Sequence, residues 1–257
     1  MRKTFLTGYE LIDKDLGGLK RGEVTLIGGR PQMGKTSLAL QIALNVARQG
    51  TKVVYFSAEA SSVELELRLI SFISNIPYVK ICKWDLTDTE WELFKSAAKE
   101  VKDLPIHFLY CGDLMYVKYW WEHERPDTKL IIYDYYQVIH KEPTQIKGST
   151  PNLTPVDYLI EIKKIAMKFK NPVIVLTQLS RKLERRKDKR PRIEDIRIKN
   201  LSESAYDQAI LLYRDVYYES EAPRNKAELI GICRAKQIEK TYNVSWNWDK
   251  GGFEEIQ

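Results

Sequence analysis

The chain has 257 residues, which is enough for one large domain with a sizeable core or at most two small ones. A hydrophobic content of 44% and a charged content of 30% describe a soluble globular protein, and no apolar run approaches the ~18 residues of a membrane span, so we expect no membrane association. The net charge of +6 is compatible with a polyanionic partner but does not require one.

The cysteines and the first residues bear on cellular location. Cys82, Cys111 and Cys233 are far apart and odd in number, without metal or redox spacing, which favours buried thiols in a reducing cytosol. Residues 1–8 contain neither a long apolar core nor a small-residue cleavage site, so they do not resemble a signal peptide. We therefore expect a cytoplasmic protein.

The first half of the chain alternates short apolar strands with amphipathic helices. A turn-rich opening carries a short helix at 9–15, which leads into a strand at 24–28 and a helix at 37–47. The next expected elements are a strand at 52–57, a helix at 61–74, a helix at 87–103 that opens with the capping-box pattern Thr87-Asp88-Thr89-Glu90, a strand at 105–109 and an aromatic-rich helix at 113–124.

The second half continues the alternation and ends in strands. The expected elements are a strand at 129–134, a loop at 141–155, a helix at 156–170, a strand at 172–178, a long charged segment at 181–204 and strands at 208–213, 228–233 and 242–248. This order predicts an α/β fold with a mostly parallel, twisted sheet, helices on both faces and right-handed crossovers. The last strands are close enough in sequence to pair antiparallel. We find no repeat and no composition break that would mark a second domain.

A glycine-rich stretch lies between the first strand and its helix. It fits the phosphate-loop pattern of Gly, four residues and Gly-Lys-Thr, and a loop of this kind points backbone N–H groups at phosphate oxygens. Lys35 would reach the β- and γ-phosphates, and Thr36 would hold Mg²⁺. A chance glycine turn is the alternative, but the order strand, loop, helix favours nucleotide binding. The predicted nucleotide-binding residues are Gly29, Arg30, Pro31, Gln32, Met33, Gly34, Lys35, Thr36 and Ser37.

Three further polar residues follow predicted parallel strands, where functional side chains collect in such sheets. Asp134 ends an apolar strand and suits the magnesium site beside Thr36. Glu59 suits the carboxylate that activates the attacking water, and Gln178 suits an amide that senses the γ-phosphate. The alternative for each is a solvated surface position.

The segment after Gln178 is strongly cationic. Eight of the twelve residues from 181 to 192 are Lys or Arg, against two acids, and such a segment can neutralise phosphates of a polyanion. A solvated loop that merely aids solubility is the alternative. Because the segment follows a γ-phosphate sensor, we favour nucleic-acid contact here and at the 141–155 loop. The candidate residues are Lys141, Lys147, Arg181, Arg185, Arg186, Lys187, Lys189 and Arg190.

Several motifs in fixed order now resemble one family. The stretches that carry the resemblance are Thr7-Gly8, Leu16-Gly17-Gly18-Leu19, Gly22-Glu23, residues 28–36, Phe56-Ser57-Ala58-Glu59, Asp134-Tyr135-Tyr136-Gln137, residues 176–181, Asp188-Lys189-Arg190-Pro191, Asp195-Ile196-Arg197 and Tyr213-Arg214-Asp215. Over nearly the whole chain they look like the ATPase domain of DnaB-type replicative DNA helicases.

The resemblance implies a RecA-like P-loop NTPase core with ATP and Mg²⁺ as cofactors. It also implies a homo-oligomeric ring, usually a hexamer, with ATP between subunits and movement along single-stranded DNA. The roles carried over are those of Lys35 and Thr36 in the phosphate loop, of Glu59 as the catalytic carboxylate, of Asp134 at magnesium and of Gln178 at the γ-phosphate. The family's DNA loops correspond to about 141–155 and 180–204.

Three features depart from the family pattern. Only six residues precede Thr7, so we expect a single RecA-like ATPase domain over 1–257 without the family's N-terminal helical domain and linker helix. The family's Lys-x-Arg near the C-terminus, which reaches the neighbour's γ-phosphate, is matched by Arg234 and Lys236 in swapped order, so we expect slow or assembly-dependent hydrolysis. Residues 198–200 also differ from the family's usual Glu-Ser-Gly.

Three functions remain open at this point. The leading hypothesis is an ATP-driven helicase motor that acts as a ring on single-stranded DNA. The runner-up is a RecA-like ATP-dependent protein that binds or loads single-stranded DNA without unwinding it. A small-molecule kinase ranks last, because the sequence shows no lid segment apart from the basic loop.

Overall fold

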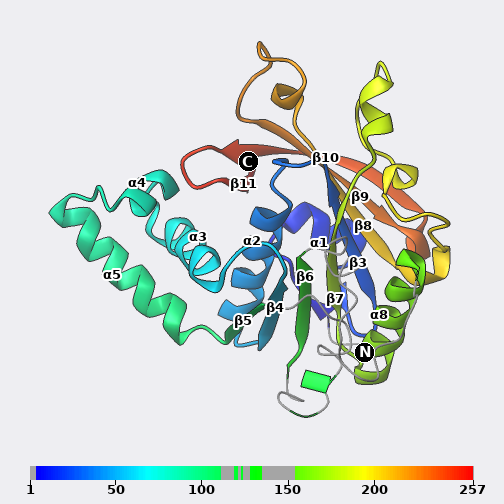
Figure 1. Cartoon of the computed structure of the whole chain (residues 1–257), viewed down its shortest axis with the longest axis horizontal. Helices are drawn as coiled ribbons and strands as arrows, with labels where there is room; N and C mark the ends of the chain where they lie inside the picture. The colour runs from blue at the N-terminus through cyan, green and yellow to red at the C-terminus, as the bar shows by residue number, and fades with distance from the viewer. Residues whose placement is uncertain (1–3, 111–118, 121–122, 124–127, 135–153, 257) are drawn as a thin grey trace.

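The computed structural model describes residues 4–110, 119–120, 123, 128–134 and 154–256. Within these residues the strands form one nine-stranded sheet and a separate two-stranded ribbon of β1 (Thr4–Phe5) and β2 (Leu19–Lys20) (Figure 1). In spatial order the large sheet contains β11 (Gly252–Glu255), β10 (Ile238–Asn247), β9 (Lys226–Cys233), β8 (Gln208–Tyr213), β3 (Val24–Gly29), β7 (Val173–Gln178), β6 (Leu130–Asp134), β4 (Val53–Ser57) and β5 (Ile106–Tyr110).

The parallel part of the sheet runs from β8 to β5 and positions the site. β3 lies between β7 and β8, and both neighbours are parallel to it. Gly29 pairs with Gln178 and Ser57 pairs with Asp134, so the ends of these four strands meet at one edge. β9, β10 and β11 extend the sheet antiparallel, which confirms that the C-terminal strands pair with one another.

Helices cover both faces of the sheet, as predicted. α1 (Glu10–Leu16), α2 (Lys35–Arg48) and α3 (Ser62–Ser74) lie on one face, and α8 (Pro155–Phe169) lies on the other (Figure 1). Successive strand residues point to opposite faces. Ile27 and Tyr55 therefore pack into the core under α2, whereas Leu26 and Phe56 pack into the core under α8.

Two further helices, α4 (Tyr78–Lys83) and α5 (Asp88–Asp103), extend outward beyond α3 (Figure 1). The capping box at the start of α5 is confirmed, since the Thr87 hydroxyl accepts the Glu90 N–H and the Glu90 carboxylate accepts the Thr87 N–H. Trp84, Trp91 and Phe94 form an aromatic cluster with ring centroids 5.6–5.8 Å apart. Trp84 is 56% exposed, so part of this cluster lies at the surface.

The predicted elements match the structure in order and type, with a few additions. The structure adds β1, β2, α4 and β11, and it resolves the charged segment into three 3₁₀ turns, η1 (Arg181–Arg185), η2 (Ile193–Asp195) and η3 (Glu203–Ala205). Of the helix predicted at 113–124, residues 119, 120 and 123 are helical and the rest lie outside the described residues. The loop predicted at 141–155 lies outside them up to residue 153.

The thiol prediction is wrong for one cysteine. Cys233 is buried on β9, but Cys82 is exposed on α4, a short helix that the sequence patterns did not reveal and whose buried residue is Ile81. Cys111 lies outside the described residues. In the part of the chain that the structure describes, no helix is both long enough and apolar enough to cross a bilayer.

Candidate functional site

The phosphate-loop sequence forms a tight turn between β3 and α2. Two residues adopt left-handed backbone conformations, Gln32 with φ 63° and Gly34 with φ 98°. Gly34 is the N-cap of α2, and a Cβ atom there would lie 2.5 Å from the Trp246 ring and 3.0 Å from the Phe253 ring. Glycine is therefore required at this position both for its backbone angle and for the close approach of the C-terminal strands.

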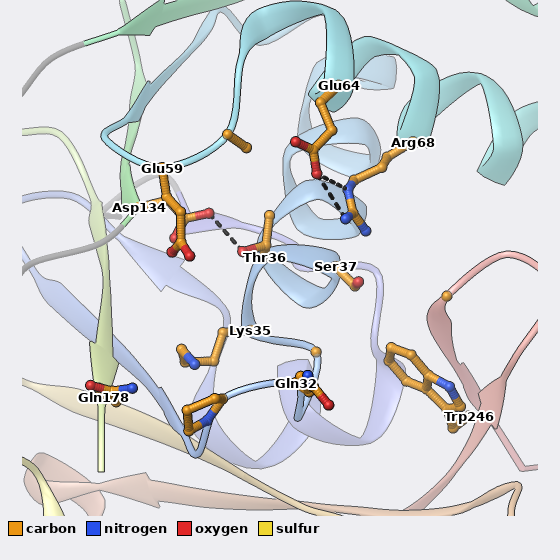
Figure 2. A pocket seen from close by; sticks show the side chains of 14 residues that line it. Gln32, Lys35, Thr36, Ser37, Glu59, Glu64, Arg68, Asp134, Gln178 and Trp246 are labelled. Atoms are coloured by element: carbon orange, nitrogen blue, oxygen red, sulfur yellow. Dashed lines mark hydrogen bonds and ion pairs between the residues drawn. The ribbon is translucent and has the colours of Figure 1, made fainter. Parts of the chain in front are cut away.

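A cleft of ≈ 580 Å³ opens at the N-terminal end of α2 (Figure 2). N–H groups at a helix N-terminus favour a bound anion such as phosphate. The predicted site residues that line the cleft are Pro31, Gln32, Gly34, Lys35, Thr36, Ser37, Glu59, Asp134 and Gln178. The structure thus brings together residues that the sequence places more than a hundred positions apart.

Thr36 and Asp134 lie side by side in the cleft (Figure 2). The Thr36 hydroxyl donates to Asp134 Oδ2 at 2.8 Å, and the Tyr55 hydroxyl donates to the same oxygen at 2.7 Å. Burial raises the pKa of Asp134, while the hydrogen bonds from Tyr55 and Thr36 and the charge of Lys35 oppose this rise. A hydroxyl beside a carboxylate is the oxygen donor set that Mg²⁺ prefers, so these two residues fit the ion.

Lys35 begins α2 and extends along the same cleft. Burial lowers the pKa of its ammonium group, and the carboxylates of Asp134 and Glu59 oppose that shift. Its Nζ donates to the carbonyl oxygen of Arg30 at 3.2 Å. A desolvated lysine beside helix N–H groups is suited to bind an anion, because the anion compensates the charge of the ammonium group.

Glu59 and Gln178 mark two sides of the cleft (Figure 2). Glu59 is exposed two residues after β4, next to the Asp134 and Thr36 pair. Gln178 ends β7, directly beside Gly29 in the sheet. Their placement allows a carboxylate to act on a water at one side of a bound phosphate while an amide contacts the other side.

The structure adds cleft residues that the sequence patterns did not reveal. Arg68 on α3 pairs with Glu64 at 2.9 Å, and both side chains line the cleft (Figure 2). Trp246, on the C-terminal strand β10, also lines the cleft. The i, i+4 spacing of Glu64 and Arg68 was visible in the sequence, whereas nothing local indicated that Trp246 would approach the phosphate loop.

Arg214 connects the phosphate loop with the C-terminal part of the chain. Its guanidinium lies 4.0 Å from the Trp246 ring centroid and 4.6 Å from that of Trp248, and it donates to the Gln32 carbonyl at 3.4 Å. Burial lowers the pKa of Arg214 to about 10. This cation therefore joins the end of β8, the C-terminal strands and the phosphate loop.

The cationic segment begins at the same edge of the sheet. A second cleft of ≈ 440 Å³ lies beside the first, and Gln178 lines both. The residues around this second cleft are Arg30, Gln178, Leu179, Ser180, Arg181, Lys182, Arg185 and Arg197. Arg181, Arg185 and Lys187 are exposed, as nucleic-acid contact requires.

Three of the candidate cations contact the protein itself. Arg186 pairs with Asp195 at 2.6 Å, and Arg190 binds both carboxylate oxygens of the buried Glu228 at 2.7 Å. The Lys189 ammonium lies 5.5 Å from the Tyr218 ring centroid. These contacts hold the segment against the domain. Lys141 and Lys147 lie outside the described residues.

Arg234 and Lys236 lie at the opposite edge of the sheet. They follow β9, whose last residue, Cys233, pairs with the first residue of β8. Arg234 contacts Glu203 at 2.6 Å, and Lys236 donates to the Asp15 carbonyl at 2.6 Å. At ~3.3 Å per strand residue, roughly 15 Å of sheet separates this edge from the phosphate loop. The structure does not bring these two cations to the cleft of their own chain.

Comparison with known proteins agrees with this geometry. The family model described as the DnaB-like helicase C terminal domain matches residues 5–254. The replicative DNA helicase DnaB of Buchnera aphidicola is 30% identical over 254 residues, which cover 94% of this chain and 54% of that protein. The replicative DNA helicase DnaC of Bacillus subtilis is 31% identical over 236 residues, which cover 90% of this chain and 51% of that protein. The chain thus spans about half the length of these curated relatives.

Solved structures give the same result. A solved ATPase domain superposes with a TM-score of 0.87 at 28% identity, and the match covers 99% of this chain and 92% of that one. A DnaB-like replicative helicase, solved in a study of its interactions with primase, superposes with a TM-score of 0.88 at 27% identity and covers 99% of this chain and 62% of that one. The nine-stranded, mostly parallel sheet is the RecA-like core of these ATPase domains.

Proposed function

This chain belongs to the DnaB-like helicase C-terminal domain family, and from this membership we propose that it is the ATP-dependent motor domain of a replicative DNA helicase. One observation carries the proposal. A cleft at one sheet edge gathers the phosphate loop, Glu59, Asp134 and Gln178, and a cationic segment starts three residues after Gln178. The nucleotide-binding cleft and the cationic surface for a polyanion therefore lie at the same edge of the sheet.

The residues of the cleft support ATP hydrolysis with defined roles. The loop N–H groups and Lys35 bind the phosphates, and Thr36 with Asp134 would hold Mg²⁺, an ion that would supply charge neutralisation at the phosphates. Glu59 accepts a proton from the attacking water, since its carboxylate lines the cleft beside Thr36 and Asp134 and is open to solvent there. Gln178 contacts the γ-phosphate and passes its presence to the segment that follows.

Assembly completes the site in this proposal. Because Arg234 and Lys236 lie at the opposite sheet edge, they can support hydrolysis only at the cleft of another copy. A head-to-tail contact of this kind closes into a ring when its rotation permits. We propose a homo-oligomeric ring, hexameric as the family resemblance implies, with single-stranded DNA held by cations such as Arg181, Arg185 and Lys187.

ATP hydrolysis with and without single-stranded DNA tests the proposal. We expect DNA to stimulate hydrolysis, and Lys35→Ala to lower the rate by ~100-fold or more, because the phosphates lose their principal cation. No stimulation together with full activity of Lys35→Ala would contradict a motor.

Unwinding of a forked duplex separates the helicase from the second candidate, a protein that binds or loads single-stranded DNA. The observation in favour of this second candidate is that Arg234 and Lys236 stand in the reverse of the family's Lys-x-Arg order.

A further inference from the structure

Arg30 lies in the phosphate loop, but its side chain does not line the first cleft. It lines the second cleft, and its side chain is only 7% exposed. Nε donates to Glu184 Oε1 at 2.7 Å, and Nη1 donates to the Leu179 carbonyl at 2.9 Å. The cation of the phosphate loop is therefore bound to the chain that follows Gln178.

The main chain of the same residue contacts the catalytic lysine. Lys35 Nζ donates to the Arg30 carbonyl at 3.2 Å. A turn of Lys35 toward phosphate oxygens moves Nζ, and therefore alters or breaks its 3.2 Å contact with the Arg30 carbonyl. Arg30 thus contacts Lys35, a residue of the nucleotide cleft, through its carbonyl, and the cationic segment through its guanidinium.

Glu184 is the acid through which this contact enters the cationic segment. It lies on η1, among Arg181, Lys182 and Arg185. Leu183 is buried, so η1 is fixed to the core on one side. A charge-assisted hydrogen bond at 2.7 Å to a nearly buried guanidinium fixes it on the other. A shift of Arg30 must therefore move η1 or break this ion pair.

We propose that Arg30 and Glu184 form the bridge through which nucleotide in the first cleft changes the DNA affinity of the cationic segment. The bridge rests on the proposed function and assigns to this pair a positioning role within it. Leu179 contributes its carbonyl, so the bridge also contacts the residue next to the γ-phosphate sensor. Coupling requires an element that both sites contact, and Arg30 contacts Lys35 of the first cleft and Leu179 of the second.

The test compares DNA affinity in two nucleotide states. Binding of the full chain to a fluorescein-labelled oligothymidylate is measured with ADP and Mg²⁺ and then with a non-hydrolysable ATP analogue and Mg²⁺. The ratio of the two dissociation constants reports the coupling, and for the native chain we expect roughly 5-fold or more. In Glu184→Gln, which keeps the size of the side chain and removes its charge, we expect the ratio to fall to within about 2-fold of unity.

Asp188→Asn provides the matched control. Asp188 lies in the same segment and is exposed, and it contacts Arg190 rather than Arg30. Both substitutions remove one negative charge, so both should tighten DNA binding in each nucleotide state. Only Glu184→Gln should change the ratio. A general effect of charge would leave the ratio equal in the two variants and would overturn the bridge.

A double-substitution cycle gives a second readout. If the two side chains act as one bridge, Arg30→Gln alone lowers the ratio as far as Glu184→Gln does, and the double variant lowers it no further than either single substitution. Additive losses, or a native ratio in Glu184→Gln, would contradict the inference while leaving the motor intact. A native chain whose DNA binding ignores nucleotide would contradict the proposed function, and the bridge with it.

Discussion

Asp134 combines a cost in stability with a role in activity. Burial raises the pKa of Asp134, so the folded chain holds this proton at pH values where the unfolded chain has lost it. Stability contributed by the protonated form is therefore lost as the pH rises through the folded pKa. Asparagine can accept the same hydrogen bonds from Thr36 and Tyr55 and carries no charge.

We expect Asp134→Asn to be more stable than the native chain at neutral pH and to hydrolyse ATP at least ~100-fold more slowly, because the carboxylate that would hold Mg²⁺ is gone. The stability difference should shrink as the pH falls from neutral through the raised pKa of Asp134, where the native carboxyl takes up its proton. Thermal unfolding of both proteins across this range checks the sign. Lower stability of the variant at neutral pH would show that the carboxylate stabilises the fold.

At the scale of elements, the junction of the phosphate loop with α2 depends on the C-terminal strands. Gly34 and Gly50 flank α2, and both have positive φ. A Cβ at position 34 meets the Trp246 and Phe253 rings, whereas a Cβ at position 50 meets nothing within 4 Å. Gly50→Ala should cost about 1 kcal/mol from its backbone conformation. Gly34→Ala should cost roughly 1–3 kcal/mol more from overpacking. Chemical denaturation of the two variants measures the difference, and equal losses would mean that the C-terminal strands adjust freely.

Within the cationic segment, we expect some residues to stabilise the fold and others to bind DNA. Arg190 pairs with the buried Glu228, so Arg190→Ala should destabilise the fold by about 1–3 kcal/mol; partial exposure of Arg190 and the nearby Lys226 moderate the loss. Arg185 is exposed, so Arg185→Ala should leave stability unchanged and reduce the salt dependence of DNA binding by roughly one unit of slope. Denaturation and salt titrations distinguish the two. A native salt slope in Arg185→Ala would exclude that residue from the DNA surface.

The sequence predicted the parts of the site that depend on local pattern. The phosphate loop is a contiguous motif, and Asp134 and Gln178 end apolar strands whose edge follows from the parallel sheet. Contacts between distant segments could not be predicted in this way. The pairing of Arg190 with Glu228 and the approach of Trp246 to Gly34 depend on how β9 and β10 extend the sheet.

The missed elements have short, ambiguous sequences. α4 has six residues and begins after Pro77, too few to show helical periodicity. β11 has four residues and begins with glycine, which is typical of a turn. Both are fixed by tertiary contacts, as when the Tyr78 N–H donates to the Asp249 carbonyl. Tertiary packing therefore determines these short elements more than local preference does.

At the scale of the whole molecule, Arg234 and Lys236 lie far from the cleft of their own chain. We therefore predict that two inactive variants regain activity when they are mixed. A working site in the proposed ring combines Lys35 of one copy with Arg234 and Lys236 of another. Lys35→Ala alone and the double variant Arg234→Ala, Lys236→Ala alone should both be nearly inactive. Randomly mixed in equal amounts, they should regain about one quarter of the native activity, since that share of the interfaces is complete. ATP hydrolysis across mixing ratios measures this recovery. A mixture no more active than its components would assign the cations no role between copies.

The support that the C-terminal strands give to Gly34 has a consequence for synthesis on the ribosome. The phosphate loop is synthesised about two hundred residues before the Trp246 and Phe253 rings that pack against it. The central strand β3 must likewise wait for β7 and β8 before it has neighbours. A nascent chain therefore carries the motif well before it can use it, and competence for ATP arises only after β10 and β11 have been synthesised.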